Sequence, residues 1–174
     1  RSDLLVVTFT PGKENLTTAE DIILYKNENG KFKRMTSIFD KRFKSRYAMP
    51  TAVADFNGDK FLDFYIGFPG AKDFTTLKER SITNEGYQVQ GLYVNNQKDG
   101  FNDESKKYLK KSAFSSNLYP HSSVAVDYDQ DGDMDLIVID DRGNVSPIFE
   151  NKGNGEFEQS NKKIGVTNEG YAMG

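Results

Sequence analysis

The chain lacks cysteine and tryptophan and has a single histidine, His121. Without cysteine, it has no disulfide framework, no thiolate zinc site and no cysteine nucleophile. It also lacks an excess of either charge. The 23 lysines and arginines stand against 26 aspartates and glutamates, and the net charge of −3 excludes a globally basic nucleic-acid-binding protein. No apolar run approaches the ~20 residues that a membrane-spanning helix needs. What remains is a chain of 174 residues with 13 Phe and 9 Tyr, long enough for one domain and too aromatic for an acidic disordered tail.

An internal repeat organises most of the sequence. Residues 47–66 align with residues 119–138 over 20 positions without a gap. A third copy is divided between the two ends of the chain, because Asp3–Val6 matches the end of the unit and Tyr171–Gly174 matches its beginning. A second motif follows each copy at a matching place. It is a short apolar segment ending in Asn, an Asn/Gly turn and a segment opening on Phe, at residues 24–32, 92–101 and 148–157.

Each complete unit carries four strand signals. They are Thr51–Phe56, Leu62–Phe68, Gly91–Asn95 and a strand opening at Phe101, then Ser122–Tyr128, Met134–Asp140, Pro147–Asn151 and a strand opening at Phe157. The second strand of each unit is almost wholly apolar, as expected for a strand covered on both faces. Units of ~50–70 residues with four strands each are typical of β-propeller blades. A β-sandwich is the alternative, but it gives no reason for an acidic loop to repeat in register.

The acidic loop of the second unit has the spacing of a calcium loop. Asp127, Asp129 and Asp131 alternate at positions 1, 3 and 5, and Gly132 at position 6 allows the sharp turn. Asp135 at position 9 supplies a closing carboxylate, and the backbone carbonyl of Asp133 would add a further oxygen. The loop is not an EF-hand, because position 12 is a valine and the flanking segments are strands. A solvated acidic hairpin without a metal is the alternative.

The first unit has a related loop with Asp55, Asn57, Asp59 and Asp63 at the same positions. Its glycine stands at position 4, and Lys60 occupies the position that glycine holds in the other loop. A lysine there must accept an unusual backbone angle or alter the loop. We therefore expect a weaker calcium site, with a metal-poor turn as the alternative.

These patterns resemble the FG-GAP/VCBS repeat, the calcium-binding blade of integrin-α-like β-propellers. The Leu-Tyr-x-Asn-x-x-Gly-x-Phe pair and the terminal Tyr-Ala-Met-Gly are most similar to bacterial members that carry an ASPIC/UnbV-type module. The resemblance implies a metal bound by the side chains at positions 1, 3, 5 and 9 and by the carbonyl at position 7. On this sequence the ligands are Asp127, Asp129, Asp131, Asp135 and the carbonyl of Asp133, and then Asp55, Asn57, Asp59, Asp63 and the carbonyl of Phe61.

The sequence therefore predicts an all-β fold, a partial β-propeller of four-stranded antiparallel blades with calcium-binding hairpin loops. Residues 1–46 would be strands of an incomplete blade, 47–118 and 119–170 two blades, and 171–174 the start of the next. Because propellers have ~4–8 blades, we expect a segment of a larger propeller whose remaining blades are its partners. Assembly of several copies into one ring is the alternative. At most a turn or two of helix is expected, near residues 103–111.

Basic residues cluster in the predicted connections between blades. The clusters are Lys41, Arg42, Lys44 and Arg46, then Lys106, Lys107, Lys110 and Lys111, then Lys162 and Lys163. We expect them on the face opposite the acidic loops, where an acidic glycan or protein would bind. Solvated charge without a partner is the alternative.

The predicted function is that of a calcium-stabilised, secreted or cell-surface binding or adhesion propeller. No enzyme motif is present, and His121 and Ser122 are adjacent on a strand, so their side chains point to opposite faces. The competing hypothesis is a propeller shell that serves a secreted enzyme.

Overall fold

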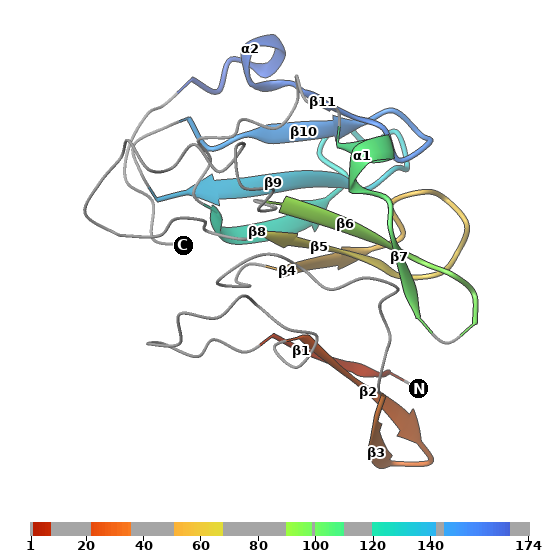
Figure 1. Ribbon diagram of the computed structural model, residues 1–174. Coiled ribbons are helices and arrows are strands. Elements are labelled where there is room, and N and C mark those ends of the chain that lie inside the picture. The colour runs from red at the N-terminus through yellow and green to blue at the C-terminus, as the bar shows by residue number, and fades with distance from the viewer. Residues whose placement is uncertain are drawn as a thin grey trace.

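The computed structural model describes residues 2–7, 22–35, 51–67, 90–98, 100–109, 120–141 and 145–167. The described residues form three antiparallel sheets (Figure 1). The first sheet contains β1 (Leu4–Val7), β2 (Ile22–Glu28) and β3 (Lys31–Arg34). The central sheet contains β4 (Thr51–Ala54), β5 (Asp63–Gly67), β6 (Gln90–Asn95) and β7 (Phe101–Asp103). The third sheet contains β8 (Pro120–Val126), β9 (Asp135–Asp140), β10 (Ile148–Asn151) and β11 (Phe157–Gln159).

In every sheet, strands that follow one another in the sequence are also neighbours in space. The prediction of an all-β chain with four-stranded antiparallel sheets is confirmed, and the observed strands lie within two residues of the predicted bounds. The expected short helix is α1 (Ser105–Tyr108), and an unexpected helix, α2 (Asn161–Ile164), follows β11. Among the described residues, no helix has the length and apolar character needed to cross a bilayer.

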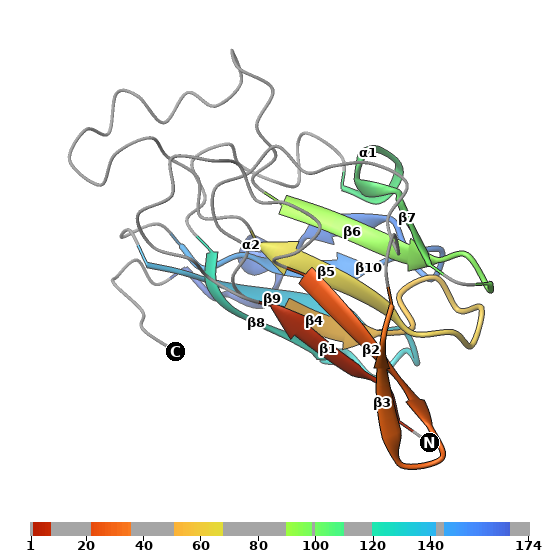
Figure 2. The same cartoon turned by 60° about the horizontal axis from the view of Figure 1, so that its bottom comes forward.

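The central sheet is buried on both faces. Phe64 and Ile66 of β5 pack against the first sheet, and Tyr65 between them packs against the third. Successive side chains of a strand point to opposite faces, so the apolar run Phe64–Ile66 of β5 serves two cores at once. Figures 1 and 2 show the three sheets stacked with the central one in between. The predicted two-sided burial of this strand is confirmed, because every residue of β5 is buried.

The first strands of the central and third sheets, β4 and β8, lie next to each other. Ala52 and Ala54 of β4 are buried in the core shared with the third sheet. Small side chains at these alternate positions let the two strands approach closely. After β4, the ring of Phe56 packs edge-on against Phe157, with centroids 5.7 Å apart. Across the same interface, the Asn151 side-chain amide donates to the carbonyl of Phe56 at 2.8 Å.

Glu150 of β10 is a buried carboxylate with three donors. It accepts hydrogen bonds from Lys152 Nζ at 2.5 Å, Lys163 Nζ at 2.7 Å and the Tyr128 hydroxyl at 3.0 Å. The hydrogen bond from Lys152, followed by that from Lys163, lowers the pKa of Glu150 to about 2. This carboxylate ties α2 to the outer part of the third sheet.

Protonation of Glu150 is expected to destabilise the fold. Its ordinary pKa of 4.5 lies above the folded value of about 2, so the unfolded chain takes up this proton first as the pH falls. The free energy of unfolding of the wild type should therefore fall between about pH 4.5 and about pH 2. Urea titrations across this range should show a flatter profile for Glu150→Gln. Glu158→Gln is the control, because Glu158 also pairs with Lys152, at 3.3 Å, but its side chain is 73% exposed. A profile that is unchanged in Glu150→Gln would contradict this role.

Candidate metal centre

The loop between β8 and β9 brings three carboxylates together. One oxygen each of Asp127, Asp129 and Asp135 lies within 4.8 Å of the other two. Two oxygens that each contact a calcium ion at ~2.4 Å are separated by at most ~4.8 Å, so this spacing fits a shared calcium ion. The donor set is all oxygen, which suits a hard cation better than a transition metal.

Backbone hydrogen bonds to Asp127 fold this loop. Its two carboxylate oxygens accept the N–H groups of Asp131 at 3.2 Å and Gly132 at 3.1 Å. Asp131 in turn accepts the N–H of Asp133 at 2.9 Å. Gly132 has a φ of 98°, as expected for the turn, and Gln130 also adopts a left-handed φ of 63°. The loop therefore turns at two positions, and only the second was signalled by a glycine.

Asp135 anchors the site at the start of β9. It is fully buried, and its carboxylate accepts the N–H groups of Tyr128 and Asn151, each at 2.9 Å. Burial raises the pKa of Asp135, the two backbone donors oppose this rise, and the negative charges of Asp129 and Asp131 add to it. A cation bound among these oxygens would relieve both the desolvation and the repulsion.

The loop between β4 and β5 repeats this construction. The carboxylate of Asp55 accepts the N–H groups of Asp59 at 3.1 Å and Lys60 at 2.7 Å. Asp63 is fully buried and accepts the N–H groups of Phe56 at 3.1 Å and Asn95 at 2.9 Å. Burial, with a smaller contribution from the charges of Asp59 and Asp55, raises the pKa of Asp63 to about 6.

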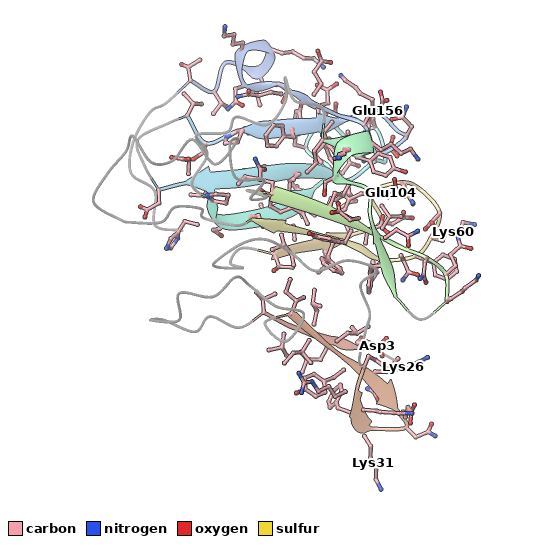
Figure 3. The ribbon with its side chains drawn as sticks, viewed as in Figure 1. Asp3, Lys26, Lys31, Lys60, Glu104 and Glu156 are labelled. Carbon is pink, nitrogen blue, oxygen red and sulfur yellow. The ribbon has the colours of Figure 1, made fainter. Side chains whose placement is uncertain are left out.

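The two loops differ in how they use glycine. In the first loop Gly58 and Lys60 have φ values of 75° and 72°, at the places of Gln130 and Gly132. Lys60 therefore accepts the left-handed conformation, one of the two outcomes that the sequence left open, and its side chain points into solvent (Figure 3). Each loop thus puts one glycine and one long side chain at its two left-handed positions, in opposite order.

The first loop also has fewer free oxygens. Asp59 accepts side-chain amide donors from Asn57 at 3.3 Å and Gln97 at 3.2 Å, and its other oxygen accepts the N–H of Phe61 at 2.9 Å. Within the part of the chain that the structure describes, the three-carboxylate cluster occurs only in the second loop. Calcium binding by the first loop remains a prediction for Asp55, Asn57, Asp59, Asp63 and the Phe61 carbonyl. In the second loop, it remains a prediction for Asp131 and the Asp133 carbonyl.

Sequence reasoning missed the role of the recurring Asn. Asn27, Asn95 and Asn151 each donate their backbone N–H to the aspartate that opens the second strand of the unit, at 2.8–2.9 Å. Their side-chain oxygens accept N–H groups of the following turn. The signal was present in the repeated Leu-Tyr-x-Asn motif, which indicated a turn but not a link to the acidic loop.

The predicted separation of acidic and basic faces is wrong for α1. Tyr108 of this helix packs under the turn after β10, where a Cβ atom on Gly155 would lie 2.6 Å from the ring. That turn is at the acidic-loop end, because β10 ends at Asn151, beside Asp135. Burial of Tyr108 therefore holds Lys107, the residue before it, near the acidic loops, where the negative charge of Glu156 acts on it. Figure 3 labels Glu156 beside α1. The first basic cluster, Lys110 and Lys111 lie outside the described residues.

Comparison with known proteins finds neither a family model nor a curated protein that matches this chain.

Proposed function

We propose that the chain is part of a calcium-stabilised β-propeller that serves as an extracellular binding module. The observation that carries the proposal is the cluster of Asp127, Asp129 and Asp135, whose oxygens have the mutual spacing of ligands to one calcium ion. The repeated construction of the first loop supports a recurring element of the fold, since Asp55 and Asp63 accept the same backbone donors as their counterparts.

The propeller arrangement is supported by the way in which the sheets stack. Each four-stranded sheet runs from its first strand to its last without a crossover, as in a propeller blade. Adjacent sheets pack face to face, and the first strands β4 and β8 lie side by side. In the proposed ring these strands line the axis and the acidic loops share one face.

The proposed metal is structural. Four aspartate side chains and a backbone carbonyl would fill most of the 6–8 positions in a calcium shell, which leaves little room for a substrate. Extracellular calcium modules typically bind with dissociation constants of ~10⁻⁴–10⁻³ M, which suits a secreted or cell-surface protein. An acidic glycan or an acidic protein surface is the proposed ligand class, supported by the exposed Lys162 in the connection after the third sheet.

Isothermal titration with calcium tests the proposal directly. The wild type is expected to bind with a dissociation constant of ~10⁻⁴–10⁻³ M, and Asp129→Ala should weaken binding at least tenfold because it removes a ligand oxygen. Asp133→Ala is the matched control: it removes a carboxylate from the same loop but keeps the backbone carbonyl, so its affinity should stay within about threefold of wild type. Equal losses of calcium affinity in the two variants would indicate general electrostatic attraction instead of coordination by specific ligands. If titration of the wild type with calcium released or absorbed no heat of binding, the proposal would be refuted.

A further inference from the structure

The sequence contains three Asn-Gly pairs, a dipeptide in which asparagine loses its amide most readily. They are Asn29–Gly30, Asn57–Gly58 and Asn154–Gly155. In this reaction the backbone nitrogen of the glycine attacks Cγ of the asparagine, and glycine favours the attack because it has no Cβ to obstruct it. The nitrogen must lose its proton and turn towards Cγ. A glycine N–H that is held in a hydrogen bond therefore reacts slowly, and the structure distinguishes the three pairs on this ground.

Two of the three glycine N–H groups are held. Gly30 donates to Oδ1 of Asn27 at 2.8 Å, and Gly155 donates to Oδ1 of Asn151 at 3.2 Å. Gly155 is also buried, and a Cβ atom on it would lie 2.6 Å from the Tyr108 ring. In both of these turns, a local opening must come before the attack.

Gly58 has neither restraint. It is exposed, and within the described part of the chain its N–H has no acceptor. Apart from its chain neighbours, no heavy atom lies within 4 Å of a Cβ built on it. The side chain of Asn57 is held by Asp59, whose N–H donates to Oδ1 at 3.0 Å and whose carboxylate accepts Nδ2 at 3.3 Å. The second of these bonds is long, so this pair is the one best placed to react.

Loss of the Asn57 amide would change the candidate calcium ligands of the first loop. Position 3 of the loop would gain the carboxylate that Asp129 supplies in the second loop. The donor from Nδ2 to Asp59 would disappear, which frees an oxygen of Asp59 and places two negative charges side by side. The amide helps to close this loop without a metal, whereas the acid would need a cation to offset the repulsion.

We propose that Asn57 is a site of spontaneous deamidation, and that the reaction sets the calcium affinity of the first loop. A bond forms between Gly58 N and Asn57 Cγ, the Cγ–Nδ2 bond breaks, and the amide leaves as ammonia. Water then opens the resulting succinimide. Cleavage of the new bond gives aspartate, and cleavage of the original peptide bond gives isoaspartate, whose main chain runs through Cγ. The modification requires no metal, but its effect on affinity rests on the proposed function.

The two products should act on calcium binding in opposite directions. Calcium affinity rises with the charge of the ligands, so Asn57→Asp, which copies the first product, should bind calcium at this loop about tenfold more tightly. Isoaspartate adds a main-chain atom between Asp55 and Asp59. The carboxylate of Asp55 accepts the N–H of Asp59 at 3.1 Å, and a longer main chain would displace this donor. The isoaspartate form should therefore lose calcium binding at the first loop.

Peptide mapping by mass spectrometry tests the modification, after the full chain has been incubated in warm, mildly alkaline buffer with EDTA. Asn57 should deamidate at least about threefold faster than Asn29 and Asn154, because their glycine N–H groups must first be released. Gly58→Gln should slow the reaction at Asn57, and this variant should fold because Gln130 adopts a φ of 63° at the same place of the second loop. Asn27→Ala is the matched variant, since it releases the Gly30 N–H and should speed the reaction at Asn29 while leaving Asn57 unchanged.

Equal rates at the three pairs, or a slower rate at Asn57, would overturn the modification site. An unchanged calcium affinity in Asn57→Asp would overturn its effect on the loop. A parallel incubation in calcium tests the proposed function separately, because a metal bound to Oδ1 of Asn57 would hold the side chain and slow the attack. If calcium leaves the rate at Asn57 unchanged while Asn57 remains the fastest of the three, ligation by Asn57 is refuted and the modification site stands.

Discussion

Calcium at a hundred times its dissociation constant, ~10–100 mM for the proposed affinity, is expected to raise the melting temperature of the chain by ~5–10 °C relative to EDTA. Calcium at a hundred times its dissociation constant adds ~2.7 kcal/mol to the free energy of unfolding if it binds only the folded state. For a chain of this length, each kcal/mol shifts the melting temperature by ~2–4 °C. Differential scanning calorimetry in the two buffers measures the shift.

The change in melting temperature caused by Asp129→Ala should depend on whether calcium is present. In calcium the variant should melt below wild type, because a ligand is lost. In EDTA it should melt at or slightly above wild type, because Asp129 repels Asp135 and raises the pKa of that buried carboxyl. The control is Asp133→Ala, which should keep most of the calcium-induced shift. Equal melting temperatures of wild type in calcium and in EDTA would contradict a structural metal.

Asn151→Ala is expected to cost ~3 kcal/mol of folding free energy, one of the largest losses for a single substitution outside the apolar core. The side chain is 1% exposed and makes four hydrogen bonds. Its amide donates to the carbonyls of Phe56 and Met134, and its oxygen accepts the N–H groups of Gly153 and Gly155. Truncation leaves the Phe56 carbonyl and the Gly155 N–H without a partner in a buried place, which costs more than the bonds contribute. Urea denaturation measures the loss.

Asn95→Ala is the matched control for that substitution. Asn95 occupies the same position of the repeat, and its backbone N–H makes the same bond to an aspartate. Its side chain accepts the N–H of Gln97 at 2.7 Å and makes only the long contact with Leu62. We expect a loss of about 1 kcal/mol or less. Equal losses in the two variants would mean that the bond across the sheets contributes nothing.

The elements that the sequence predicted well are those in which local pattern and packing agree. The run Phe64–Ile66 of β5 is apolar because both faces of the strand meet a core, and Leu136 and Val138 of β9 face one core. The acidic loops repeat in register, so strands, pairing and candidate ligands followed from spacing. α2 was missed because its order depends on a tertiary contact. The Asn161 side chain accepts the N–H of Ile148 at 2.9 Å and donates to the carbonyl of Ser146 at 2.9 Å.

Two details of the candidate site were beyond sequence reasoning for a physical reason. The left-handed conformation of Gln130 is imposed by the bonds that draw the following N–H groups to Asp127, and no property of glutamine announces it. The bond from Asn151 to Phe56 joins residues 95 positions apart in the sequence. Only the stacking of the sheets brings them together.

The two-sided burial of the central sheet makes stability a shared property of neighbours. A sheet with two apolar faces is no folding unit by itself, because Tyr65 on one face and Phe64 on the other each need a different adjoining sheet. Free energy is therefore stored at the boundaries between units, as in linear repeat proteins, where each unit stabilises the one beside it. Destabilising either outer sheet would therefore first destabilise the central sheet. Folding would begin at the boundary between sheets that forms first and continue outwards from it.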